Sequence, residues 1–451
     1  MAESLLANRD AFIDEIINFV SSSPSSYHAA RFSALLLDAA GFTEHDETEP
    51  WGPVAPGSRG FVVRDGAIIA WRAGSEVTAT SPVRVLGAHT DSPGFVLKPS
   101  PDFVSDGWSQ AGVEVYGGPL INSWLDRDLG FAGRIVTRDG QEKLVQSPPV
   151  ARIPQLAIHL DRGVNNGLEL DKQRHMQPVL AVSTPGASVL RILADAANLP
   201  QPGEPFAGAS SVVLTADGGS IHPHDIVGTD VRLYDTQSGA RIGANREFLA
   251  SPRLDNLSST FAGLVAIIEA ETAPDSISMF ASFDHEELGS ETRSGACGPF
   301  LEDVLARLRA GLGASGEEAA QAMAGSWCLS ADAGHSVHPN YPDRHDPNVR
   351  PLAGKGPMLK INANQRYATD AHGAALWQRL CEAAEVPTQS FVSNNTVPCG
   401  STIGPLTATR LGMRTVDVGV PLLSMHSARE LAHVDDLHGL ARVIGAFYAD
   451  K

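Results

Sequence analysis

The chain is poor in cysteine and has no long uncharged apolar stretch. Its 451 residues include four cysteines, Cys297, Cys328, Cys381 and Cys399. They are far apart and form no Cys-x-x-Cys pair, which argues against a disulfide framework and favours reduced core thiols. No apolar run is long enough to span a bilayer, and the first residues carry no basic segment typical of a secretion signal. We therefore expect a cytoplasmic protein that does not enter membranes.

Positive charge is also scarce. Lys and Arg number 34 against 52 Asp and Glu, giving a formal net charge of −18 at pH 7. This excess of negative charge argues against nucleic acid or an anionic membrane as the main partner. Hydrophobic residues make up 43% of the chain, enough for a substantial core, and the length suits two domains or one large domain with an insertion.

The amino-acid composition changes twice along the chain. Residues 92–246 are rich in Gly, Pro and Val and contain short strand-like runs. The elements expected there are strands at residues 112–116, 133–137 and 211–215 and a helix at residues 187–197. The pair Gly117-Gly118 predicts a turn. We expect an inserted, mostly-β domain at 92–246, between the two parts of a discontinuous domain, 1–91 and 247–451.

The flanking parts alternate between helical and strand-like patterns, which is typical of an α/β fold. The expected helices are residues 5–20, 26–40, 257–270, 371–384 and 434–448, and the expected strands are residues 61–71, 83–86 and 277–283.

Histidines and carboxylates follow several of the short apolar runs. They are His89, Asp255, Glu286 with Glu287, Asp332 and His426. Short apolar runs are typical of buried parallel strands, and the crevice of an open α/β sheet lies beyond the carboxyl ends of its strands. Five strands would then deliver these side chains to one place. The ligand mix suits a pair of zinc ions, and paired metals suit hydrolysis.

Each fragment alone has a simpler interpretation. A His-x-Asp step occurs by chance, adjacent glutamates usually form a solvated face, and an Asp after a strand often caps a helix. The five fragments together are harder to explain in this way.

These motifs resemble the signatures of the M18 aspartyl aminopeptidases. The matching segments are AHTDSPG (88–94), SPRLDN (251–256), DHEELGS (284–290), SAD (330–332) with HPNY (338–341), and MHSARE (425–430). The similarity extends to SPSSYH (23–28) and PCGSTIG (398–404), so it covers essentially the whole chain in the family's order. It implies a zinc-exopeptidase-like α/β/α catalytic domain with an inserted β-rich dimerisation domain.

The resemblance also implies roles for the site residues. Asp255 would bridge two Zn²⁺ ions per subunit, with His89 and Asp332 completing one site and Glu287 and His426 the other. Co²⁺ or Mn²⁺ would suit the same ligands.

Two neighbouring carboxylates are expected to assist the metals. Glu286 is expected to act as general base towards water and then as acid towards the leaving amine. Asp91 would hold the imidazole of His89, unless it only caps a turn.

The resemblance further suggests how substrate is bound. Lys360 would face an acidic first side chain of the peptide, although it could equally point out of a strand. Tyr367 is a candidate pocket residue or hydrogen-bond donor to the transition state. His159 would reach the active site of a neighbouring subunit, although alone it is typical of a satisfied histidine at a strand end. His335 and His338 follow Asp332 closely, and we expect neither to be a ligand.

The expected function is that of a metalloaminopeptidase that removes N-terminal Asp or Glu from peptides. The resemblance implies a homo-oligomer, a tetrahedral dodecamer with interior active sites. One alternative is a related two-metal aminopeptidase with a neutral or broad preference. Another is an oligomeric shell that binds peptides without cleaving them, against which the joint presence of Glu286 and five ligand residues speaks.

Overall fold

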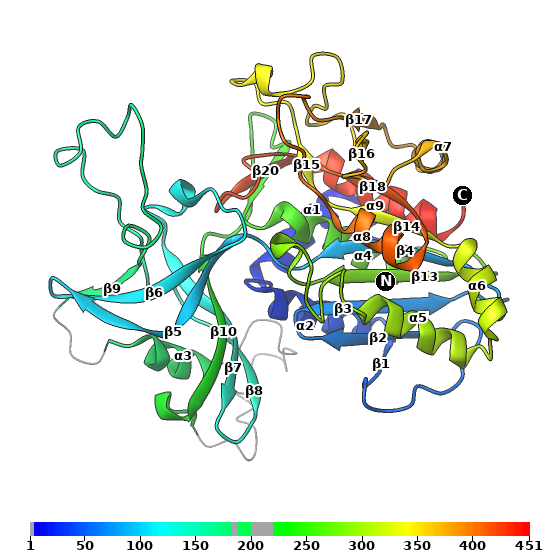
Figure 1. Ribbon diagram of the computed structural model, residues 1–451, viewed down its shortest axis with the longest axis horizontal. Coiled ribbons are helices and arrows are strands. Elements are labelled where there is room, and N and C mark those ends of the chain that lie inside the picture. Colours follow the sequence, from blue (N-terminus) through cyan, green and yellow to red (C-terminus); the bar gives the residue numbers. More distant parts are fainter. Residues whose placement is uncertain (1–3, 183–186, 200–219) are drawn as a thin grey trace.

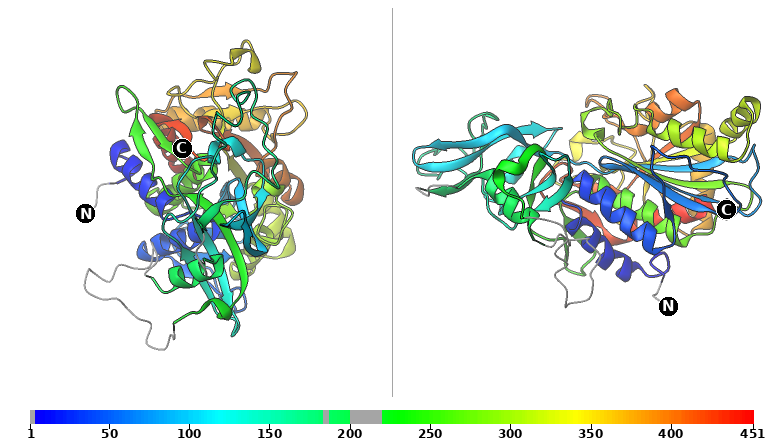
Figure 2. Two further views of the ribbon diagram at one scale, coloured as in Figure 1. Left: turned by 90° about the vertical axis from the view of Figure 1, so that its left-hand side faces the viewer. Right: turned by 90° about the horizontal axis from the view of Figure 1, so that it is seen from below.

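The computed structural model describes residues 4–182, 187–199 and 220–451. Two bodies lie side by side along the long axis of the molecule, one around a nine-stranded sheet and one around a six-stranded sheet (Figures 1 and 2). The strand expected at residues 211–215 lies outside the described residues.

The nine-stranded sheet has the order β1-β2-β3-β13-β4-β14-β18-β16-β17. Its centre consists of four parallel neighbours: β13 (Ile277–Phe283), β4 (Val83–His89), β14 (Trp327–Ala331) and β18 (Arg414–Gly419). All seven residues of β13 are buried, as expected for a parallel strand covered on both faces. The outer strands are β1 (Thr43–Glu44), β2 (Arg59–Arg64), β3 (Ala67–Ala73), β16 (Met358–Lys360) and β17 (Gln389–Phe391).

Helices cover both faces of this sheet. One face, which includes Leu86 and Phe280, packs on α1 (Arg9–Ser21), α2 (Ser26–Ala39), α4 (Leu254–Glu269), α7 (Ala371–Ala383) and α9 (Val434–Tyr448). The other face, which includes Val85 and Met279, packs on α5 (Phe300–Gly311) and α8 (Ile403–Leu411). α6 (Gly316–Ala324) has one buried residue, and its Met323 packs against the core formed with α5. Successive strand residues alternate between the two cores, so the body has three layers and the α/β/α fold class is confirmed.

The six-stranded sheet is antiparallel, in the order β8-β7-β10-β5-β6-β9. Its strands are β5 (Gly94–Ser105), β6 (Trp108–Tyr116), β7 (Leu129–Thr137), β8 (Glu142–Gln146), β9 (Val179–Val182) and β10 (Ile226–Asp235). It packs on α3 (Val189–Ala197) to form a hydrophobic core of its own. The sheet is thus built wholly from residues between His89 and Asp255.

A smaller five-stranded sheet has the order β11-β12-β20-β19-β15. Its strands are β11 (Ala240–Ile242), β12 (Phe248–Ser251), β15 (Gly334–His335), β19 (Pro421–Leu423) and β20 (Glu430–His433). β12, which precedes α4, pairs antiparallel with β20, which precedes α9. The entry to α4 therefore lies beside β20.

The strand expected at residues 61–71 is wrong, because the segment forms a hairpin. β2 ends at Arg64 and β3 begins at Ala67, with Asp65 at φ 56° in the turn. Asp-Gly is a strong signal for such a turn, and Asp is among the residues that adopt a positive φ most readily. Helix α5 was also not predicted, although Phe300, Val304 and Leu308 follow a helical spacing.

Across the described parts of the chain, no helix has both the length and the apolar character needed to cross a bilayer.

The close approach of α4 to the sheet can be tested at Gly263. A Cβ there would collide with the side chains of Leu86 and Phe280, whereas a Cβ at Gly445 on α9 would make ordinary contacts of 3.5 and 3.6 Å. Alanine in a helix gains about 0.8–1.0 kcal/mol over glycine, but overpacking a core costs about 1–3 kcal/mol or more. We expect Gly263→Ala to lower the melting temperature and Gly445→Ala to raise it. Equal shifts in calorimetry would contradict this account.

Candidate metal centre

Three of the central strands end beside one another at the candidate site. His89 is the last residue of β4, Asp332 directly follows β14, and β13 leads through Asp284 to the short 3-10 helix η3 (Glu286–Leu288). Because β13, β4 and β14 are parallel neighbours, their carboxyl ends share one edge of the sheet.

Asp255 and His426 come from a different sheet than expected. The apolar run 415–426 divides into β18 and β19, and the chain passes to the five-stranded sheet after Gly419. His426 lies between β19 and β20, and Asp255 follows β12 at the start of α4. The expectation that five strands of one sheet supply the site is therefore wrong. Two sheets supply it.

The side chains form two groups of three that share Asp255. One group is His89, Asp255 and Asp332, the other is Asp255, Glu287 and His426, and the ligand atoms of each group lie within 4.8 Å of one another. Glu286 belongs to a further group with His89 and Glu287 that satisfies the same distance.

The spacing inside these groups is that of metal ligands. His89 Nε2 lies 3.4 Å from Asp255 Oδ1 and 3.6 Å from Asp332 Oδ1. His426 Nε2 lies 3.5 Å from Asp255 Oδ2 and 3.4 Å from Glu287 Oε1. Two atoms about 2.0–2.1 Å from one tetrahedral ion are roughly 3.3–3.4 Å apart. Strong hydrogen bonds between charged groups are shorter, about 2.7–2.9 Å.

Two buried carboxylate oxygens in the site accept no hydrogen bond: Asp255 Oδ1 and Glu287 Oε1. A buried polar atom without a partner is costly, and a charged one more so. Divalent cations between these oxygens and the two imidazoles would supply the missing partners. The residues present therefore fit a pair of metal ions.

Both histidines turn the same nitrogen towards the carboxylates. His89 Nδ1 lies 3.1 Å from the backbone oxygen of Asp91, and His426 Nδ1 lies 3.1 Å from the backbone oxygen of Gly118. A carbonyl oxygen only accepts, so Nδ1 carries a hydrogen in each ring, and Nε2 is the nitrogen placed to bind a cation. This is the arrangement that metal-binding histidines use.

Asp91 holds the backbone of the two glutamates. Its Oδ1 accepts the N–H of Glu286 at 3.0 Å and its Oδ2 accepts the N–H of Glu287 at 3.2 Å. Its carboxylate also lies 3.4 Å from Nδ1 of His89, farther than its own backbone oxygen. Asp91 thus fixes η3 relative to the end of β4.

Glu430 plays the matching part on the other side and was not singled out from the sequence. Its Oε2 accepts the N–H of Asp255 at 2.9 Å, and its Oε1 accepts the N–H of His426 at 2.7 Å. The side chain is buried at the start of β20, opposite Ser251. Its position at the end of the MHSARE motif is the sequence feature that could have identified it as part of the site.

Protein charges alone leave the cluster short of positive charge. Burial raises the pKa of Glu286 to about 8, with Asp332 adding to the effect. Burial, followed by the charge of Asp255, raises the pKa of Glu287 well above its usual range. Burial lowers the pKa of His426, but its hydrogen bond to Asp255 and the charge of Glu287 outweigh burial and raise it to about 10. Bound cations would favour the ionised carboxylates and the neutral imidazole.

Lys360 is buried beside the cluster. Its Nζ donates to the backbone oxygen of Ala333 at 2.7 Å, and lies 4.0 Å from Asp332 Oδ2 and 5.3 Å from the centre of the Tyr367 ring. An added Cβ would collide with the Asp332 backbone oxygen at Gly419 and with Met358 Cε at Gly334, and would lie 3.2 Å from Lys360 Cε at both positions.

The other candidate histidines lie outside the two groups. His159 is exposed in a turn of the loop that precedes β9. His335 lies at the end of β15, with its ring centre 6.2 Å from that of Phe391. His338 Nδ1 accepts the N–H of Asn340 at 3.2 Å, which gives it a local structural role.

Comparison with known proteins extends the resemblance to whole chains. The family described as "Aminopeptidase I zinc metalloprotease (M18)" matches residues 19–448. "Probable M18 family aminopeptidase 2" of Streptomyces coelicolor is 47% identical over 439 residues, covering 96% of each chain. The protein of the same name from Pseudomonas paraeruginosa is 44% identical over 442 residues, covering 97% of each.

Solved structures show the same similarity in three dimensions. A chain from "Cryo-EM structure of the Ape4 and Nbr1 complex" is 33% identical with a TM-score of 0.91, covering 100% of this chain and 87% of that one. A chain from "Structure of S. cerevesiae mApe1 dodecamer" is 28% identical with a TM-score of 0.79, covering 97% and 96%. The chain belongs to the M18 family of aminopeptidases.

Proposed function

We propose that this aminopeptidase uses two metal ions to remove N-terminal residues from peptides, acidic residues in preference. The observation that carries the proposal is the pair of ligand groups joined at Asp255, with unpaired carboxylate oxygens in both. Asp255 would hold both ions, His89 and Asp332 would complete one site, and Glu287 and His426 the other. Zinc suits these ligands, and cobalt and manganese also bind such sets.

The metal pair, when bound, supplies Lewis acidity towards the peptide carbonyl and lowers the pKa of water. Glu286 is the proton carrier of the proposed mechanism. Its carboxylate lies within 4.8 Å of the ligand atoms of His89 and Glu287, and its backbone is fixed by Asp91. There it accepts a proton from the attacking water and passes it to the amine of the leaving peptide.

Lys360 supports the acidic preference. Its ammonium lies at the edge of the cluster, under the ring of Tyr367, and only backbone Ala333 accepts a hydrogen bond from it among the described contacts. Two further N–H donors remain for a carboxylate, because an ammonium has three. Tyr367 would close the same pocket.

We also propose that residues 92–246 form an inserted domain that joins subunits, with residues 1–91 and 247–451 as the catalytic domain. The six-stranded sheet has its own core, and large apolar side chains are exposed around it. They include Phe103, Val104, Trp108, Leu156, Ile158 and Leu160. Burial against other copies would remove them from water. A related M18 structure is a dodecamer, so we propose a tetrahedral dodecamer in which the exposed His159 reaches a neighbouring site.

The metal and substrate assignments predict a specific pattern of turnover. We expect kcat/KM to be highest for Asp- and Glu-p-nitroanilide, lower for Leu- and Ala-p-nitroanilide, abolished by chelator and restored by zinc. A higher kcat/KM for Leu-p-nitroanilide would contradict the proposed acidic pocket but would still be consistent with the proposed metal centre. No cleavage by protein with two ions per chain would favour the peptide-binding shell.

The roles of Glu286 and His426 can be separated by substitution. Glu286→Gln should keep two ions per chain and lose roughly 10²–10⁴-fold in kcat, because a positioned base is removed. His426→Ala should instead lower the metal content itself. Metal analysis alongside steady-state kinetics checks both, and near-normal turnover of metal-loaded Glu286→Gln would remove Glu286 from the mechanism.

The pocket assignment can be tested at Lys360. Lys360→Met keeps an unbranched buried stem but removes the charge, and a hydrogen bond between charged groups contributes about 1.5–3 kcal/mol. The Asp/Leu ratio of kcat/KM should therefore fall by about 10-fold or more. Lys355→Met, at an exposed lysine five residues earlier in the chain, is the control and should leave the ratio unchanged. An unchanged ratio in Lys360→Met would refute the assignment.

A further inference from the structure

The segment Tyr116–Leu120, called here the bridging segment, connects the two bodies at the metal centre. It begins at the end of β6 in the six-stranded sheet and leads into the 3-10 helix η1 (Ile121–Trp124). Gly117, at φ 66°, packs on η3: a Cβ there would lie 3.2 Å from Glu287 Cβ and 3.3 Å from the Glu287 backbone oxygen. The segment thus reaches a metal-site residue of the other body.

The bridging segment also holds the loop of His426 at two points. The Gly118 carbonyl accepts the hydrogen of His426 Nδ1 at 3.1 Å, and the Leu120 N–H donates to the His426 backbone oxygen at 2.8 Å. Directly after the segment, Ser123 Oγ accepts the N–H of Ala428 at 2.8 Å. These contacts set both the position of His426 and the nitrogen it presents.

Tyr116 makes the third connection. Its hydroxyl donates to Asp91 Oδ2 at 2.7 Å, and Asp91 in turn holds the backbone of Glu286 and Glu287. The Arg232 guanidinium of β10 lies 3.8 Å from the Tyr116 ring centre and keeps the ring in place. The six-stranded sheet therefore also supports η3 through a buried hydrogen-bond chain.

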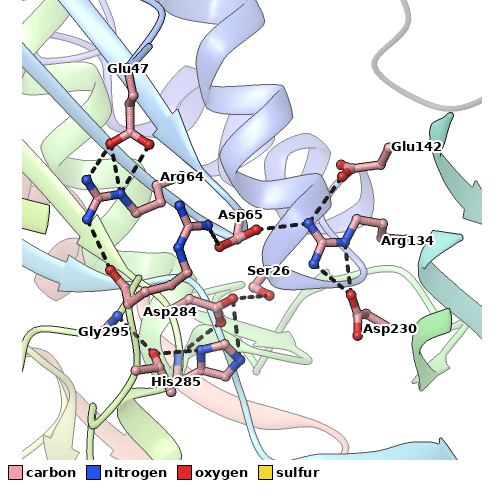
Figure 3. Close-up of polar contacts among 12 residues, drawn as sticks. Ser26, Glu47, Arg64, Asp65, Arg134, Glu142, Asp230, Asp284, His285 and Gly295 are labelled. Atoms are coloured by element: carbon pink, nitrogen blue, oxygen red, sulfur yellow. Dashed lines mark hydrogen bonds and ion pairs between the residues drawn. The ribbon is translucent and has the colours of Figure 1, made fainter. Parts of the chain in front are cut away.

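An ion pair anchors the six-stranded sheet where it meets the nine-stranded body. Arg134 of β7 contacts Asp65 in the β2–β3 turn at 3.0 Å, while also pairing with Asp230 of β10 at 2.7 Å (Figure 3). Its guanidinium lies 4.4 Å from the ring centre of Tyr27 on α2. This contact fixes the sheet that carries the bridging segment.

We propose that the bridging segment is a positioning element for Glu287 and His426, so that the affinity of the Asp255, Glu287 and His426 group for a divalent cation depends on the six-stranded sheet. This rests on the proposed metal ligands and extends them. The inserted body then serves the chemistry of its own subunit as well as assembly. Groups that orient metal ligands typically change metal affinity about 10–100-fold when altered.

The first test substitutes Gly117 and a matched glycine. Gly117→Ala brings a methyl group against Glu287, whereas Gly140→Ala, at φ 85° in the same body, meets nothing within 4 Å. Both strain a left-handed backbone position, but only the first disturbs a proposed ligand. Chelator-stripped, full-length protein would be titrated with zinc against a chromophoric chelator. We expect two ions in the wild type, one of them bound about 10-fold or more weakly in Gly117→Ala, and both unchanged in Gly140→Ala.

The second test removes a single hydroxyl. Tyr116→Phe breaks the hydrogen bond to Asp91, and Tyr234→Phe removes a hydroxyl that donates to the Ser147 backbone oxygen at 2.6 Å. Both tyrosines are 7% exposed, so the substitutions are matched in burial. Only Tyr116→Phe should weaken zinc binding. In size-exclusion chromatography, which reports the assembly state, both variants should elute at the wild-type volume.

The outcomes separate this inference from the proposed function. Wild-type zinc affinities in both Gly117→Ala and Tyr116→Phe would overturn the inference while leaving the two-metal site in place. Equal weakening in Gly117→Ala and Gly140→Ala would also overturn it, because strain alone would then be responsible. A wild-type chain that binds no zinc would overturn the ligand assignment and this inference with it.

Discussion

Buried negative charge is the constraint around which the structure is arranged. Six carboxylates gather in one buried space: Asp91, Asp255, Glu286, Glu287, Asp332 and Glu430. Four backbone N–H groups donate to Asp91 and Glu430 and offset part of this charge. The N-terminus of α4, which starts beside Asp255, adds its helix dipole. Bound cations would neutralise the remaining negative charge. The carboxylates repel one another, so rigid elements must hold them in position.

That support comes from the two sheets that meet at the site. The parallel strands β4, β13 and β14 fix His89, Asp332 and η3, while the pairing of β12 with β20 fixes Asp255 and Glu430. α4 lies between these two sources, with its residues buried from Leu254 to Ile267. A displacement of one sheet against the other would therefore separate ligands that the proposed mechanism needs together.

The sequence predicted the fold class and the set of clustered side chains well, because both leave local patterns. Apolar runs that end in His89 or Asp332 are direct signs of parallel strands. The passage of the chain to another sheet before His426 leaves no such sign, since an apolar run looks alike in either sheet. Glu430 was missed because a glutamate in a polar motif usually faces water. The role of Gly117 depends on how two bodies pack, which no local pattern encodes.

The order of the ligands along the chain has a consequence for folding. His89 and Asp255 are neighbours in space, but the whole six-stranded sheet lies between them in sequence. Asp255 is likewise separated from His426 by most of the central strands. Contacts of such wide sequence separation form only after long loops have closed, and they come late in folding. Under the proposed ligand assignment, the two groups are complete only when residues far apart in the sequence have been brought together.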